Sequence, residues 1–126
     1  MPEILAALAE RVFHEGWVEQ PLDRCLINDY LPGQGIAAHV DYDRFGDEVV
    51  MISLLDEYPM AFAEVDGEGR FEQWLARRSI CVIKGPARHA WTHEIARRFS
   101  DPQPGGGRRQ RRRRISITYR RSLENG

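Results

Sequence analysis

Residues 25–43 read CLINDYLPGQGIAAHVDYD, and this stretch decides the fold. It begins with an apolar run, is interrupted by Pro32-Gly33 and Gly35, and continues with a second short apolar run before a polar end. Short apolar segments separated by Pro and Gly are typical of β-strands joined by turns. We therefore predict strands over 24–30 and 35–38.

The same pattern continues to the end of the chain, and it predicts further strands over 47–55, 60–65, 78–84, 88–92 and 113–121. In the last of these, apolar and polar residues alternate along RISITYR at 114–120, as expected of a strand with two different faces. Many short strands at this spacing indicate an antiparallel β-sandwich or rolled barrel.

Three segments depart from the strand pattern. Residues 3–15 carry apolar side chains at helical spacing and are followed by Gly16, so we predict one amphipathic helix there and no second convincing helix. Residues 66–77 fit either a hairpin turn with a strand or a short helical turn. The segment 100–112 is rich in Pro, Gly and Arg and predicts an exposed loop within the same domain.

Composition limits the class of protein. A chain of 126 residues with 42% hydrophobic and 29% charged residues fits a single globular domain over 1–126. No apolar run approaches the length of a bilayer span and the N-terminus lacks a leader pattern, so we expect a soluble, cytoplasmic protein without a membrane partner. Cys25 and Cys81 lie in apolar runs, which favours buried free thiols over a disulfide.

Charge is distributed unevenly along the chain. Residues 1–96 hold 8 basic and 17 acidic side chains, whereas residues 97–126 hold 10 basic and 2 acidic ones. The basic excess is concentrated in the Arg-rich segment 108–113. Because guanidinium groups bind phosphate well, this segment predicts a nucleic-acid partner. The alternative is a solvated basic loop, which the neighbouring run of glycines also fits.

The His-x-Asp triplet at His39 and Asp41 is a candidate metal site. Residues i and i+2 of an extended segment point to the same side, so both side chains can reach one ion. His93, at the end of another predicted strand, can supply a third ligand. Two histidines and one carboxylate on one face leave coordination positions open, which suits a non-haem Fe(II) oxygenase. A histidine in a loop can equally be solvated or simply hydrogen-bonded.

Arg114 and Arg120 project from the same face of the last predicted strand. Two guanidinium groups beside apolar strand residues need an anion, and a dicarboxylate such as 2-oxoglutarate fits, with one end on the metal and the other held by arginine. The alternative is that both residues only continue the basic run.

The run at 25–43, the segment Thr92-His93-Glu94-Ile95 and the strand 114–120 together resemble the AlkB-type Fe(II)/2-oxoglutarate dioxygenases. The resemblance covers about residues 20–121, and its motifs stand in the family's order. It implies a mainly β fold, a double-stranded β-helix or jelly roll, which here follows one N-terminal helix. It also implies Fe(II), 2-oxoglutarate and O₂ as cofactor and co-substrates.

By this resemblance, His39, Asp41 and His93 hold the iron and form the catalytic centre. Five residues are expected to contact 2-oxoglutarate: Asn28, Tyr30 and Ser116, with Arg114 at the distal carboxylate and Arg120 near the metal-proximal one. Asp43 matches a residue with which some members read the target base, and we add its neighbours Tyr42 and Arg44 as residues of the mouth of the site.

Two departures from the family concern the substrate. The chain begins about one helix before the core, so we expect the N-terminal lid that grips a flipped nucleotide to be missing. In addition, Glu94 follows His93 where the family has glycine. We predict oxidative demethylation or hydroxylation of alkylated or modified nucleic-acid bases, in DNA repair or tRNA modification. The alternatives are an oxygenase for a protein side chain or metabolite, and a non-catalytic β-barrel module that binds RNA.

Overall fold

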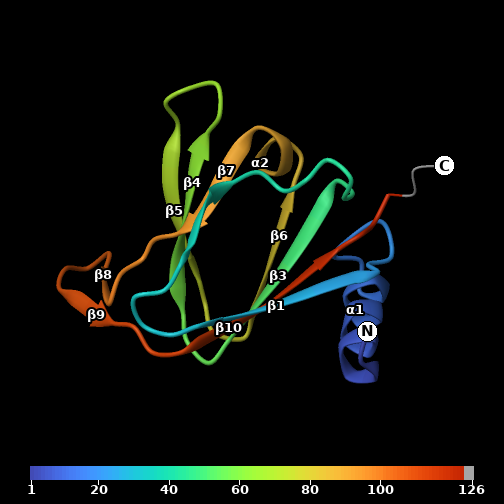
Figure 1. Ribbon diagram of the computed structural model, residues 1–126, viewed down its shortest axis with the longest axis horizontal. Helices are drawn as coiled ribbons and strands as arrows, with labels where there is room; N and C mark the ends of the chain where they lie inside the picture. Colours follow the sequence, from blue (N-terminus) through green and yellow to red (C-terminus); the bar gives the residue numbers. More distant parts are fainter. Residues whose placement is uncertain (124–126) are drawn as a thin grey trace.

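The structure is a computed structural model and describes residues 1–123, so the last three residues of the domain predicted over 1–126 lie outside the described part. Two four-stranded antiparallel sheets face each other, and one helix covers the outer face of the first sheet (Figure 1). The elements, in chain order, are α1 (Glu3–His14), β1 (Arg24–Tyr30), β2 (Ile36–His39), β3 (Glu48–Leu54), β4 (Tyr58–Glu64), β5 (Arg70–Leu75), β6 (Ser79–Lys84), α2 (Pro86–His89), β7 (Trp91–Ile95), β8 (Ser100–Pro102), β9 (Arg108–Gln110) and β10 (Arg114–Arg120).

The strand order is that of a jelly roll. The first sheet has the order β1-β10-β3-β6 and the second β2-β7-β4-β5, so strands that follow each other in the chain alternate between sheets in most places. A small hairpin of β8 and β9 projects from one end of the sandwich (Figure 1). The predicted double-stranded β-helix with an N-terminal helix is confirmed.

Both faces of the first sheet are buried, which gives the protein two cores. Val49 and Met51 of β3 point between the sheets, whereas Val50 and Ile52 point toward α1, as the alternation of a strand requires. On β10 the outward residues Ile117 and Tyr119 join the α1 core, so the polar residues of this strand face inward, between the sheets. This inward polar face positions the site described below.

Helix α1 is attached to the first sheet through its apolar stripe. Ala9 and Val12 are buried against the sheet, and the Tyr119 hydroxyl donates a hydrogen bond of 2.7 Å to the Leu5 carbonyl. Glu3 in the first turn and Arg11 in the last turn complement the helix dipole. Neither helix of residues 1–123 has the length and hydropathy that a membrane-crossing segment needs.

Three sequence predictions are wrong. We predicted a strand over 88–92 and no second convincing helix, but Pro86–His89 form the short helix α2 and β7 begins only at Trp91, because Pro86 suits the first turn of a helix. An exposed loop was expected over 100–112, but this segment forms the β8–β9 hairpin, in which Asp101 is buried. The ambiguous segment 66–77 contains strand β5. Both cysteines are free thiols, as expected, but they are half-buried rather than buried.

Candidate metal and co-substrate site

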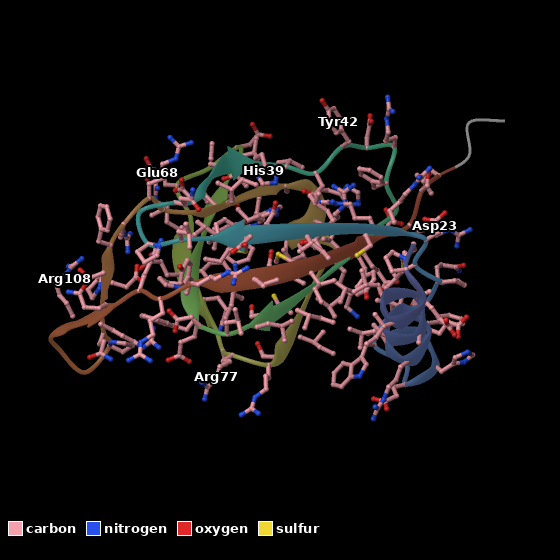
Figure 2. The ribbon with its side chains drawn as sticks, turned by 60° about the horizontal axis from the view of Figure 1, so that its bottom comes forward. Asp23, His39, Tyr42, Glu68, Arg77 and Arg108 are labelled. Carbon is pink, nitrogen blue, oxygen red and sulfur yellow. The ribbon has the colours of Figure 1, made fainter. Side chains whose placement is uncertain are left out.

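Three candidate metal ligands meet between the sheets. His39 is the last residue of β2, Asp41 follows two residues later in the loop, and His93 lies in the middle of β7. Asp41 Oδ1 is 3.3 Å from His39 Nε2 and 3.5 Å from His93 Nε2. One ligand atom from each residue lies within 4.8 Å of the others. Figure 2 shows His39 at the edge of the sandwich.

A β-bulge in β2 sets the direction of His39. Ile36 pairs with Ile95 and His39 pairs with His93, so three steps along β2 match two steps along β7. In a regular strand, residues 36 and 39 would point to opposite faces. The extra residue turns both inward, and the imidazole rings of His39 and His93 come to 4.3 Å between centroids.

Hydrogen bonds leave one metal-binding atom free on His39 and on Asp41. The Nδ1 atom of His39 lies 2.8 Å from the Ala37 carbonyl, so Nδ1 carries a proton and Nε2 is the ring nitrogen that faces Asp41. Arg120 Nε donates to Asp41 Oδ2 at 2.7 Å, which leaves Oδ1 beside the histidines. Outer contacts of this kind orient metal ligands in known metal sites.

The pKa shifts of Asp41 and His93 also favour a cation. Burial alone raises the pKa of Asp41, but hydrogen bonds with His39 and Arg120 outweigh it and hold that pKa well below its usual range. Burial, reinforced by the charge of His39, lowers the pKa of His93 to about 4. The hydrogen bond with Asp41 raises the pKa of His39, so a metal ion has to displace a proton from this imidazole. An ionised carboxylate and a neutral imidazole are the forms that bind metal.

These residues fit an Fe(II) ion. Neighbouring ligands of one ion, each about 2 Å from it, lie about 3 Å apart, close to the two distances from Asp41 Oδ1. The donor set of two histidines and one carboxylate is the facial triad of non-haem Fe(II) oxygenases, which leaves other positions open for a co-substrate.

Arg114 provides the second part of the site. Its side chain is 1% exposed and donates to Ser53 Oγ at 2.8 Å, while its buried Nε has no hydrogen-bond partner. Among residues 1–123, no carboxylate lies within ion-pair distance of this guanidinium. A buried cation without an anion is costly, so the arrangement fits an anionic ligand such as the distal carboxylate of 2-oxoglutarate.

One cavity joins the histidines to Arg114. All five residues expected to contact 2-oxoglutarate border it: Asn28, Tyr30, Arg114, Ser116 and Arg120. Burial raises the pKa of Tyr30, so its hydroxyl keeps its proton and can donate. Sequence reasoning missed Thr118 and Met51 in the cavity wall, and Ser53 behind Arg114. Thr118 could have been found, because it shares the inward face of β10 with Ser116.

The residues expected to bind the substrate lie outside this cavity. Tyr42, Asp43 and Arg44 are exposed in the turn after the metal triplet, and Tyr42, which is 74% exposed, projects away from the sandwich (Figure 2). The Arg44 guanidinium lies 5.8 Å from the centre of the Tyr42 ring. Their role in binding a substrate stays a prediction.

The Arg-rich segment is largely occupied by contacts within the protein. Arg111 is buried and forms a two-pronged ion pair with Asp101, and Arg109 pairs with Asp56. Arg113 pairs with Asp29 on the surface. Both sequence readings of this segment, a nucleic-acid contact and a solvated loop, are therefore wrong for Arg111, which is a structural residue. Arg108 and Arg112 are exposed.

Comparison with known proteins decides the family. Residues 1–120 match the sequence model of a family described as the "2OG-Fe(II) oxygenase superfamily". The chain belongs to this superfamily. Members use Fe(II), 2-oxoglutarate and O₂, which agrees with the geometry of the three ligands and Arg114. The AlkB-type character inferred from the sequence is confirmed by the named relatives.

Two curated relatives and one solved structure illustrate the match. The macaque (Macaca fascicularis) tRNA (carboxymethyluridine(34)-5-O)-methyltransferase ALKBH8 is 40% identical over 102 residues, which cover 80% of this chain and 15% of that protein. The Alpha-ketoglutarate-dependent dioxygenase AlkB homolog of Caulobacter vibrioides is 33% identical over 130 residues, covering 96% of this chain and 54% of that protein. The OsALKBH1 structure has the same fold, with a TM-score of 0.68 at 19% identity, over 96% of this chain and 66% of that one. The chain thus spans about half or less of the length of these two curated relatives.

Proposed function

We propose that this chain is the catalytic domain of an Fe(II)- and 2-oxoglutarate-dependent dioxygenase, with the iron held by His39, Asp41 and His93. One observation carries the proposal: three metal-binding atoms converge within 4.8 Å, and two of the residues that carry them, His39 and His93, line the same cavity as a buried arginine that lacks an anionic partner. Bound Fe(II) would supply the oxidation of a C–H bond by O₂, coupled to conversion of 2-oxoglutarate into succinate and CO₂.

The protein's own residues would bind and orient the co-substrate. The planar guanidinium of Arg114 would bind the distal carboxylate through two parallel hydrogen bonds. Tyr30 and Ser116 would donate hydrogen bonds to carboxylate oxygens. Asn28 lies on the same wall as Tyr30. Arg120 would hold Asp41 in place while lying near the metal-proximal carboxylate.

Apolar side chains would keep water away from the reacting atoms. Ile36, Met51 and Met60 line the cavity between the histidines and Arg114. Met51 and Met60 are both buried in the core between the two sheets, so the cavity has an apolar wall on that side. Exclusion of water strengthens the ion pair expected at Arg114 and protects reactive intermediates.

A spectroscopic titration tests the metal and co-substrate site. Anaerobic addition of Fe(II) and 2-oxoglutarate should give the wild-type protein a weak visible charge-transfer band, and His39→Ala should lose it. His14→Ala is the matched control, because His14 is an exposed histidine on α1. A band of equal strength in His39→Ala would count against the proposed ligands. Succinate formation should follow the same order among the three proteins.

We further propose a modified nucleic-acid base as the substrate, with tRNA as the first polymer to test. The name of the macaque relative refers to a tRNA uridine, and the exposed Arg112 remains available for a phosphate, whereas the exposed Arg108 donates to Ser100. The target base would have to leave its stack to reach a cavity between two sheets. If the oxidised carbon is an N-methyl group, formaldehyde should be released with the demethylated base.

Salt dependence tests the nucleic-acid part of this proposal. Binding of tRNA should weaken as salt rises, and Arg112→Gln should reduce the slope of log affinity against log salt by about one, because one phosphate contact is lost. Arg77→Gln, an exposed arginine at the opposite side of the molecule from His39 in Figure 2, should leave the slope unchanged. An Arg112→Gln slope equal to that of wild type would exclude this residue from the interface.

A further inference from the structure

A second buried arginine lies next to the metal site. Arg88 belongs to the four-residue helix α2 and is 2% exposed. Its guanidinium donates to the carbonyls of Gly46 at 3.0 Å, Asp41 at 3.0 Å, Tyr42 at 2.7 Å and Phe45 at 3.2 Å. All four acceptors are main-chain carbonyls of the loop 41–46.

Carbonyl dipoles, rather than a carboxylate, stabilise this charge. Among the described residues no acidic side chain forms an ion pair with Arg88, whereas Arg109, Arg111, Arg113 and Arg120 each have one. A buried cation must be compensated by hydrogen bonds, and four converging carbonyls satisfy most of its donors. The contacts of Arg88 therefore depend on the backbone conformation of the loop 41–46 and less on which side chains the loop carries.

The loop 41–46 lacks the sheet ladder that holds the two histidines. His39 and His93 face each other as paired strand residues, but Asp41 lies beyond the end of β2. Within the loop, the Phe45 amide donates to Tyr42 and the Gly46 amide donates to Arg121, and neither bond involves Asp41. The main chain of Asp41 is instead fixed by Arg88, from 47 positions later in the chain.

We propose that Arg88 is a positioning residue for the metal site: it holds the backbone of Asp41 at the distance from His93 that one ion requires. α2 directly precedes β7, so the same short segment carries Arg88 and His93. It thereby ties the loop that carries one ligand to the strand that carries another. This inference rests on the metal site proposed above.

The planar fork of arginine is the feature that the contact requires. Donors on Nε, Nη1 and Nη2 point in different directions and reach carbonyls at both ends of the loop, whereas lysine offers one nitrogen. Arg88→Lys keeps the charge and removes the fork. It separates a geometric role from an electrostatic one, because a purely electrostatic role would survive the substitution.

Mn(II) binding to the full chain, without co-substrate, tests this role with a redox-stable probe. Arg88→Lys should bind Mn(II) about 10- to 100-fold more weakly than wild type, the usual effect of losing a residue that orients a ligand. Arg77→Lys is the matched control, since Arg77 is exposed and remote from the site. Hydrogen exchange should accelerate in residues 41–46 of Arg88→Lys while β3 and β10 keep their protection.

Three results would overturn the inference, and they have different meanings. A folded Arg88→Lys variant with wild-type Mn(II) affinity would show that the fork does not position Asp41. A variant that stays unfolded, as judged by circular dichroism with and without Mn(II), would make Arg88 a determinant of the whole fold instead. A wild-type protein that fails to bind Mn(II) would overturn the metal site itself, and this inference with it.

Discussion

At Arg114 the protein keeps a positive charge inside its core without a negative one beside it. The guanidinium lies over the rings of Tyr30 and Tyr58, at 5.5 and 5.6 Å from their centres, and burial lowers its pKa. Such a residue weakens the fold unless a ligand neutralises it. Stability and co-substrate binding therefore oppose each other at this position.

Arg114→Met should separate these two effects. We expect 2-oxoglutarate to bind at least about 30-fold more weakly, since losing a buried charged hydrogen-bond partner costs about 2 kcal/mol or more. The melting temperature of the ligand-free protein should stay the same or rise, because a similar apolar side chain replaces an unneutralised charge. Calorimetric titration and thermal unfolding measure the two quantities.

Arg113→Gln is the control for this prediction, because Arg113 is adjacent in sequence but exposed. It should leave 2-oxoglutarate binding unchanged and lower the melting temperature only slightly, through loss of the surface ion pair with Asp29. If Arg114→Met bound 2-oxoglutarate as wild type does, Arg114 would not be the anchor of the distal carboxylate.

Sequence patterns predicted the residue types of the candidate site but not all of their contacts. His39, Asp41, His93 and Arg114 could be picked out because their chemistry is specific and their spacing is that of strands. The contact between Arg120 and Asp41, or between Arg88 and the loop, joins residues 79 and 47 positions apart. No local pattern encodes such a pairing, since it depends on how the two sheets are closed.

At the scale of elements, the close contact between β2 and β7 sets the geometry of the histidines. A Cβ atom on Gly35 would lie 2.1 Å from the Ile95 carbonyl oxygen, which is too close for any side chain. Glycine is therefore required immediately before β2, where the backbones approach each other. The bulge between Ile36 and His39 follows directly after this contact.

Gly35→Ala should push β2 away from β7 and so disturb the pair His39–His93. We expect a loss of about 1–3 kcal/mol in the free energy of unfolding, the usual cost of overpacking, together with weaker Mn(II) binding. Urea unfolding and metal titration provide the measurements. Gly105→Ala is the matched control, because a Cβ there would meet no atom within 4 Å. Equal Mn(II) affinity in Gly35→Ala and wild type would contradict the link between this contact and the site.

Strands with clear alternation could be predicted well, and those shaped by tertiary contacts could not. β1 was predicted at its observed bounds, and β10 within one residue at each end, because their apolar runs end at clear breaks. The β8–β9 hairpin was missed because each strand has only three residues and Asp101 of β8 is held by a buried ion pair with Arg111, which lies beyond β9. The bulge in β2 was missed because a side-chain period of two cannot reveal an extra residue.

For the whole molecule, the arginines after β8 connect parts that lie far apart in the chain. The Asp56 carboxylate, in the turn between β3 and β4, accepts hydrogen bonds from the Arg109 side chain and from the Arg112 amide at 2.8 Å. Burial alone raises the pKa of Asp56, but these hydrogen bonds have the larger effect, so the pKa of this carboxyl lies below its usual value. Because the folded-state pKa is lowered, the contact stabilises the fold above the unfolded-state value of about 4, and this stabilisation disappears as pH falls through the folded-state value.

Asp56→Asn should therefore change the pH dependence of stability. At pH 7 we expect the free energy of unfolding of the variant to be about 2 kcal/mol lower than that of wild type, because charged hydrogen bonds are lost. The difference should shrink as pH falls below about 4, because Asp56 becomes protonated first in the unfolded chain and then, at its lower pKa, in the folded protein. Urea unfolding at several pH values measures it, with Asp66→Asn in the exposed β4–β5 turn as control. A difference that stays constant down to pH 2 would contradict this account of Asp56.

The most direct test of the metal site is a crystal structure of the protein grown anaerobically with Fe(II), with diffraction recorded at the iron absorption edge. The account predicts one anomalous peak about 2 Å from His39 Nε2, Asp41 Oδ1 and the His93 imidazole, with open positions toward Arg114. A peak bound by other residues, or an imidazole of His93 outside the coordination sphere, would contradict it.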